Sequence, residues 1–179
     1  GFPAFSMNGN LIVEALRSSS VPPVVVAELS GNHRGELDHA LALVDAAADS
    51  GADAVKLQTY RPDTITIDSR DDRFLINEGL WAGRYLVDLY AEAMTPWEWH
   101  PALADRAAEH GMALFSSPFD ETAVDFLEAS IDPPLHKIAS FELNHFPLLR
   151  KVARTGKPVA ASVGASTSEE IGEAVALLR

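Results

Sequence analysis

Two lysines in this sequence stand inside short apolar runs, where an ammonium group is costly unless it meets a partner. Lys56 lies in Ala54-Val55-Lys56-Leu57-Gln58, and Lys137 lies in His136-Lys137-Ile138-Ala139. One interpretation is that each lysine sits at a sheet edge and extends its charged head to solvent. The other is that a closed sheet surrounds the lysines and requires an anionic partner for each. In that case the two lysines would form a clamp for a phosphate or carboxylate ligand.

Serine residues end three of the apolar runs and would add donors to such a clamp. Ser116 and Ser117 follow the run that contains Phe115, and Ser140 and Ser162 follow two later runs. Their hydroxyl and backbone N–H groups could bind the same anion. These positions therefore extend the predicted anion site to several strand ends.

A carboxylate, Glu28, ends the first apolar run, Val24-Val25-Val26-Ala27. It could act as a base or as a hydrogen-bond acceptor for a substrate hydroxyl or water. It could also be a structural partner of Lys56 or Lys137. Both interpretations place Glu28 at the same end of the sheet as the lysines.

Two amide side chains near these residues also have alternative roles. Gln58 could bind a sugar hydroxyl or hold a neighbouring loop. Asn32 could contact a ligand, but it follows Gly31, and this pair is common in turns. The histidines other than His33 show no metal-ligand spacing, so no metal-binding residue is predicted in this chain.

The elements that would position these residues alternate along the chain. Short apolar runs begin near Val24, Ala54, Met112, His136 and Pro158, and helical patterns separate them. This alternation predicts an α/β fold with a parallel sheet covered by helices. The absence of a glycine-rich fingerprint argues against a dinucleotide-binding domain. Polar strand ends are instead typical of the (β/α)8 TIM barrel, in which about 250 residues form eight strands.

The chain contains about five of the eight βα units, so an incomplete TIM barrel is predicted over residues 24–179. Helices are expected at 36–50, from about 95 to 110, at 121–129, at 147–155 and from 166 or 167 onward. The stretch 60–95 is too long for an ordinary connection and is predicted to be a lid or excursion near the active site. Residues 1–23 are expected to be an irregular N-terminal segment.

The composition excludes several classes of protein. The chain has 179 residues, 47% hydrophobic and 22% charged, with a net charge of −12 and no cysteine. The negative charge argues against nucleic acid and anionic membranes as partners. No apolar run approaches the roughly 18 residues of a membrane span. Because no secretory signal is visible, a cytoplasmic location is expected.

Six motifs, in order, resemble the sialic acid synthase family, the phosphoenolpyruvate-dependent synthases of nonulosonic acids. The motifs are Ala-Glu-Leu-Ser-Gly-Asn-His (27–33), Gly-Ala-Asp-Ala-Val-Lys-Leu-Gln-Thr-Tyr (51–60), Thr-Pro-Trp-Glu-Trp-His (95–100), Phe-Ser-Ser-Pro-Phe-Asp (115–120), His-Lys-Ile-Ala-Ser-Phe-Glu (136–142) and Gly-Lys-Pro-Val (156–159). Leu29-Ser30 and the stretch 79–84 look more like the pseudaminic acid synthase branch.

The resemblance implies a transferase that joins phosphoenolpyruvate to an open-chain N-acetylated sugar and releases phosphate. It implies a catalytic role for Glu28 beside the sugar, and substrate binding by the remaining candidates, which are Asn32, Lys56, Gln58, Ser117, Lys137, Ser140 and Ser162. A divalent metal, Mn²⁺ or Mg²⁺, would polarise the aldehyde. The family's metal-binding histidines and antifreeze-like domain lie beyond the part that this chain resembles, so both are expected to be absent from it. Val163 also departs from the family's Ser-Thr-Gly pattern.

Alternative functions remain open at this point. The chain could be a truncated, non-catalytic homologue that binds an anionic ligand or a partner. Another phosphoenolpyruvate-using barrel, such as a 3-deoxy-sugar-acid phosphate synthase, is disfavoured by the motif at 95–100. A barrel with unpaired edges is also expected to form a homo-oligomer.

Overall fold

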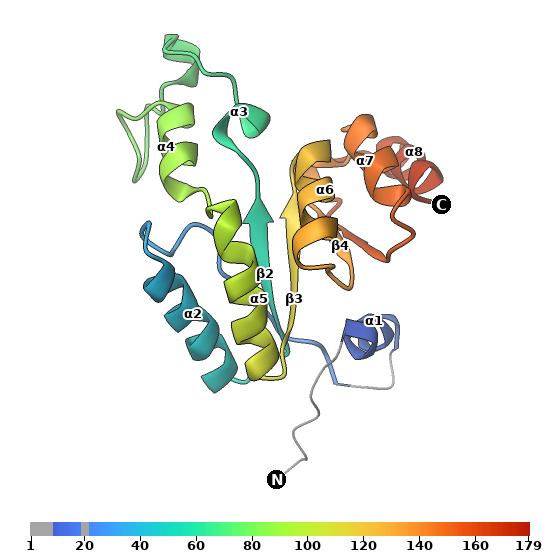
Figure 1. Ribbon diagram of the computed structural model, residues 1–179. Helices are drawn as coiled ribbons and strands as arrows, with labels where there is room; N and C mark the ends of the chain where they lie inside the picture. Colours follow the sequence, from blue (N-terminus) through green and yellow to red (C-terminus); the bar gives the residue numbers. More distant parts are fainter. Residues whose placement is uncertain (1–8, 19–21) are drawn as a thin grey trace.

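Five strands form one parallel sheet in chain order in the computed structural model, which describes residues 9–18 and 22–179 (Figure 1). The strands are β1 (Val26–Glu28), β2 (Ala54–Thr59), β3 (Ala113–Pro118), β4 (His136–Ile138) and β5 (Val159–Ala161). Strands of a (β/α)8 barrel also follow one another in chain order, whereas doubly wound sheets reverse their order. The predicted incomplete TIM barrel is therefore confirmed as the fold class.

The helices directly after β1, β3, β4 and β5, and the helix before β3, lie close to the predicted positions. The described helices are α1 (Gly9–Arg17), α2 (Leu37–Asp49), α3 (Pro62–Ile65), α4 (Leu86–Ala93), α5 (His100–Glu109), α6 (Glu121–Ser130), α7 (Phe146–Ala153) and α8 (Ser168–Leu178), with short 3-10 turns η1 (Asp72–Phe74), η2 (Trp97–Trp99) and η3 (Ser140–Glu142). Thr167 and Glu170 form the capping box that starts α8. Pro101 sits in the first turn of α5, where its missing N–H is tolerated, so this helix begins later than Thr95.

Helices pack on the outer face of the sheet and form two apolar clusters. Val55 and Leu57 of β2 pack with Val44 of α2 and with Leu103 of α5. Ile138 of β4 belongs to a second cluster with side chains from α6, α7 and α8. Each fully buried aliphatic side chain of this kind contributes about 1.5–3 kcal/mol. This layer holds the strands in register and covers one face of the sheet.

The helix α1 covers the amino end of the inner face, opposite the strand tips (Figure 1). Its Ile12 is fully buried and belongs to a cluster with Ala54, Phe115 and Leu135. The expectation of an irregular segment over 1–23 is therefore wrong for Gly9–Arg17, because the inner face of the sheet supplies an apolar surface for a short helix. The remainder of that prediction includes residues 1–8 and 19–21, which lie outside the described residues.

The predicted excursion after β2 is an ordered structure beyond the carboxyl end of that strand (Figure 1). It contains α3, η1 and α4, and a bridge pairs Leu75 with Tyr85. Its role as a lid stays a prediction. Across the described ranges, no helix combines the length and apolar character that a membrane crossing requires.

Candidate active site at the carboxyl ends of the strands

Strand register brings the predicted site residues of β1, β2 and β3 to one face of the sheet. Glu28 pairs with Lys56, and Gln58 pairs with Ser117. Paired residues in a parallel sheet point to the same side, and side chains alternate along each strand. These four side chains therefore share the inner face, opposite Leu57 and the helices.

The same register extends this face to β4 and β5. Ser116 pairs with His136, so the next residues, Ser117 and Lys137, are neighbours on the inner face. Lys137 pairs with Ala160, and Ser162 follows two residues later on the same side. The structure thus gathers the strand-borne candidates at one end of one face.

Glu28 is the acceptor at the centre of a small polar network. Its Oε2 forms an ion pair with Lys56 Nζ. Its Oε1 accepts hydrogen bonds from Ser30 N at 3.2 Å and from Ser30 Oγ at 3.1 Å, with Gln58 Nε2 at 3.5 Å. The Glu28 side chain is still 35% exposed. Glu28 is therefore a structural partner of Lys56, as one interpretation predicted, and its carboxylate also remains open to a ligand.

Lys137 makes a second polar group with the end of β5. Its Nζ donates to Ser162 Oγ and to Ile138 O, each at 2.6 Å. Neither acceptor carries a full charge, and no carboxylate of the described residues forms an ion pair or a hydrogen bond with this ammonium group. An anion arriving at Lys137 would therefore meet a positive charge that is already oriented by two hydrogen bonds.

The positive charges of Lys56 and Lys137 repel each other. Burial, together with the positive charge of Lys137, lowers the pKa of Lys56 to about 8. The contact with Glu28 opposes this shift, because a carboxylate favours the charged form of lysine. Burial also lowers the pKa of Lys137, while Glu142 raises it. A bound anion would relieve the repulsion between the two ammonium groups.

Glu142, at the end of η3, is a functional candidate that the sequence reasoning missed. Burial raises the pKa of its carboxyl group, with Lys137 and His145 acting in the opposite direction. Its Oε2 is buried and meets no hydrogen-bond partner among the residues that the structure describes. A carboxyl group whose pKa is shifted by burial and by a charged neighbour is a functional-site candidate. The sequence feature that could have identified Glu142 is its position two residues after Ser140 in the motif 136–142.

The remaining candidates have different surroundings. Ser117 is almost fully buried on the inner face, and Ser140 is half-buried at the start of η3. Asn32 is exposed and its Nδ2 donates to Leu29 O at 3.1 Å, which is the turn interpretation of this residue. Ser116, expected to add a donor, is on the outer face and bonds Thr59 Oγ1 at 2.7 Å. That expectation is wrong because strand alternation turns Ser116 toward the helices.

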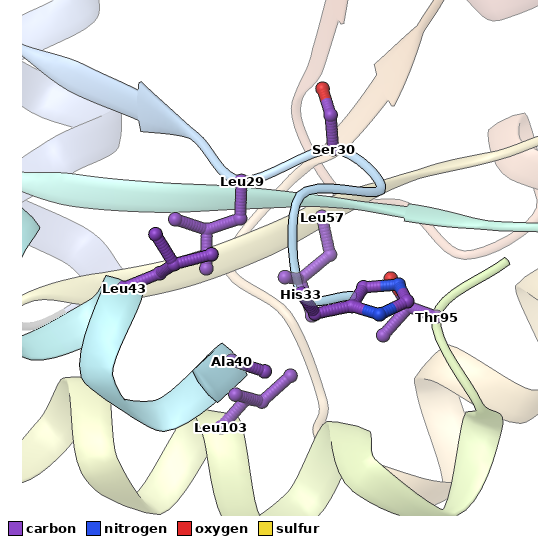
Figure 2. A pocket seen from close by; sticks show the side chains of 8 residues that line it. All are labelled: Leu29, Ser30, His33, Ala40, Leu43, Leu57, Thr95 and Leu103. Carbon is purple, nitrogen blue, oxygen red and sulfur yellow. The ribbon is translucent and has the colours of Figure 1, made fainter. Parts of the chain in front are cut away.

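Hydrogen bonds of the His33 ring anchor the loop that carries Ser30. The His33 Nδ1 accepts from Gly35 N at 3.0 Å, so its Nε2 carries the proton and donates to Ala93 O at 3.3 Å. Figure 2 shows the His33 ring beside Thr95 in a small, mostly apolar cavity, with the Ser30 side chain pointing away. Gly31 packs so closely on Ala93 that an added Cβ would lie 2.7 Å from Ala93 O. Through Ala93, the excursion over 60–95 thereby packs against the loop that follows Glu28 and holds it in place.

Within the described ranges, no group of three or more His, Asp or Glu side chains is placed so that it could hold a metal ion. The described residues by themselves therefore do not supply a metal centre.

Comparison with known proteins identifies the family. The profile of the NeuB family matches residues 43–179. The chain belongs to the NeuB family. Among NeuB relatives, pseudaminic acid synthase of Helicobacter pylori is 45% identical over 158 residues, covering 88% of this chain and 46% of the relative. Pseudaminic acid synthase of Campylobacter jejuni is 46% identical over 147 residues, covering 82% of this chain and 43% of the relative.

Solved structures share the fold of this chain. The N-acetylneuraminic acid synthetase of Leptospira borgpetersenii, solved in complex with citrate, has a TM-score of 0.75 and 27% identity, covering 90% of this chain and 53% of that one. A truncated 3-deoxy-D-arabino-heptulosonate 7-phosphate synthase from Thermotoga maritima, at 14% identity and a TM-score of 0.54 over 87% of this chain and 45% of that one, shares the fold. The chain spans less than half the length of the two pseudaminic acid synthases.

Proposed function

We propose that the complete protein carrying this chain is a nonulosonic acid synthase of the pseudaminic acid type. It would condense phosphoenolpyruvate with the open-chain form of an N-acetylated sugar and release phosphate. The observation that carries this proposal is the convergence of Lys56 and Lys137 on one face at the strand ends, beside Glu28. The 45–46% identity to two pseudaminic acid synthases supports the choice of branch.

The two lysines suit the two anionic ends of phosphoenolpyruvate. Lys137 and Ser162 already form a donor pair, and Ser117 lies beside Lys137 in the register. Lys56 would exchange part of its contact with Glu28 for the incoming anion. Charge-assisted contacts of this kind are the strongest that a protein offers to a phosphate or carboxylate.

The two carboxyl groups suit different parts of the reaction. The methylene carbon of phosphoenolpyruvate would bond to the aldehyde carbon, and the aldehyde oxygen would take a proton. Water would then add to the phosphate-bearing carbon and lose a proton. The bond between that carbon and the phosphate oxygen would break, so that phosphate leaves as a keto group forms. Glu142, whose pKa is raised by burial, can hold a proton at its unpartnered Oε2. Glu28, exposed by about a third, can accept a hydrogen bond from the water or a sugar hydroxyl.

The test is a phosphate-release assay on the complete protein with phosphoenolpyruvate and a panel of N-acetylated sugars, with added Mn²⁺, with Mg²⁺ and with a chelator. We propose that turnover requires the divalent ion. Turnover with one of these sugars, and its loss in Glu142→Gln, are expected. Binding of phosphoenolpyruvate without turnover under any condition would instead indicate a non-catalytic anion-binding homologue.

A further inference from the structure

A chain of buried hydrogen bonds lies directly behind the candidate site, between the tips of β2 and β3. Thr59 Oγ1 is 2.7 Å from Ser116 Oγ and 2.8 Å from Nε2 of His100, the first residue of α5. All three residues are fully buried on the helix-covered side of the sheet. Replacing bonded polar groups by apolar groups of the same shape is often nearly neutral for stability. Stability alone therefore does not account for this hydrogen-bond chain.

The acceptors of the hydrogen-bond chain fix the direction of each bond in it. Pro96 O can only accept, so His100 Nδ1, at 3.3 Å from it, carries the proton of the neutral ring. Burial lowers the pKa of His100 to about 4, which keeps the ring neutral near pH 7. His100 Nε2 therefore accepts from the Thr59 hydroxyl, and Thr59 Oγ1 in turn accepts from the Ser116 hydroxyl. The chain thus has one orientation, from β3 through β2 to α5.

Both hydroxyls belong to residues that adjoin candidate substrate-binding residues. Thr59 follows Gln58, Ser116 precedes Ser117, and Gln58 pairs with Ser117 in the register. Because side chains alternate along a strand, Gln58 and Ser117 point to the inner face while the two hydroxyls point to the outer face. The bond between Thr59 and Ser116 therefore joins the two strands at the level of the site. A shift of either hydroxyl would move the backbone that carries Gln58 or Ser117.

The helices anchor the hydrogen-bond chain from the outside. The His100 ring lies edge-on to Phe126 of α6, with ring centroids 5.2 Å apart. Phe126 also stacks on Trp97 at 4.6 Å, and Trp97 Nε1 donates to Tyr60 O at 3.1 Å, immediately after β2. The helical layer thus holds the tip of β2 through two polar contacts. Satisfied buried networks of this kind favour one well-defined arrangement of the elements that they join.

We propose that the three residues of the hydrogen-bond chain are positioning residues, which hold Gln58 and Ser117 at the spacing that substrate binding requires. They lie on the opposite face of the sheet from the site, so they act through the backbone and not by touching the substrate. Small displacements matter, because misplacing a group by about 1 Å can cost roughly a hundredfold in rate. This inference rests on the function proposed above, in which Ser117 contributes to binding phosphoenolpyruvate.

The test measures the dissociation constant of phosphoenolpyruvate and the number of binding sites by calorimetry on the complete protein. Ser116→Ala and Thr59→Val each remove the bond between the strands, so each should weaken binding about tenfold with an unchanged number of sites. The double variant should bind no more weakly than Thr59→Val alone, because both substitutions break the same bond. Thr59→Ser keeps the hydroxyl and should retain most of the affinity.

Ser130→Ala is the matched control, because Ser130 Oγ donates to Phe126 O at 2.7 Å at the last residue of α6, away from the strand tips. This variant should bind phosphoenolpyruvate as tightly as the wild type. A purely structural role of the hydrogen-bond chain would lower the melting temperature and the number of sites in Ser116→Ala but leave the dissociation constant within twofold. That result, or equal weakening in Ser130→Ala, would overturn this inference alone.

The phosphate-release assay separates this inference from the proposed function. A wild type that binds phosphoenolpyruvate but releases no phosphate with any acceptor would overturn the synthase function, and the dissociation constants of the variants would still decide the positioning role. A wild type that neither binds phosphoenolpyruvate nor releases phosphate would overturn both.

Discussion

Replacing Lys137 by methionine should weaken binding of phosphoenolpyruvate by the complete protein roughly ten- to hundredfold. The Lys137 ammonium group is held at 2.6 Å from Ser162 Oγ, and none of the carboxylates that the structure describes is in hydrogen-bond contact with it. A charge-assisted contact to the ligand contributes about 1.5–3 kcal/mol, and each 1.4 kcal/mol is about a factor of ten in the dissociation constant. Methionine keeps the apolar stem, so the substitution removes mainly the charge.

The same substitution should raise the pKa of Lys56. Lys137 contributes to lowering that pKa to about 8, after the larger effect of burial. Lys56 is charged below its pKa, so its contribution to anion binding is lost as the pH rises through about 8. In Lys137→Met this loss should move to higher pH, because the like charge is gone.

Calorimetric titration with phosphoenolpyruvate between pH 6 and pH 10 would measure both effects. The matched control is Lys151→Met, since Lys151 pairs with Asp125 on the surface, away from the strand ends. The control should bind as tightly as the wild type. If Lys137→Met binds within twofold of the wild type, or if both variants weaken binding equally, the anion clamp is refuted.

Further predictions address Glu28, the loop behind it and the behaviour of the chain alone. Glu28→Gln in the complete protein should nearly abolish phosphate release and shift the melting temperature by only a few degrees, because Glu28 is exposed by about a third; retained turnover with a large loss of stability would mean a purely structural role. Gly31→Ala should lower the free energy of unfolding in urea by about 1–3 kcal/mol, because its Cβ would collide with Ala93. Gly164→Ala, which meets open space, is the control, and an equal loss in both would contradict the close packing. The 179-residue chain expressed alone should self-associate in sedimentation, because within the described part of the sheet β1 and β5 each pair on one side only; a clean monomer would disprove this.

The sequence was sufficient to predict the order of the five strands and which of them carry the site. Lys56 and Lys137 stand out because a charge inside an apolar run is rare enough to be informative. The start of α8 was also visible, because the Thr167–Glu170 capping box is a contact between residues three apart. Such signals are local, so the order of residues contains them.

Only the tertiary structure decided which side chains meet. Pairing of Glu28 with Lys56 depends on strand register, which contacts distant in sequence determine. Register also separates Ser117, on the inner face, from Ser116, on the outer face, although the two are adjacent serines. The burial of Glu142 and the docking of α1 depend on surfaces that exist only when the sheet has formed. Composition and spacing indicate which residues can act, whereas the packing of the sheet decides which of them act together.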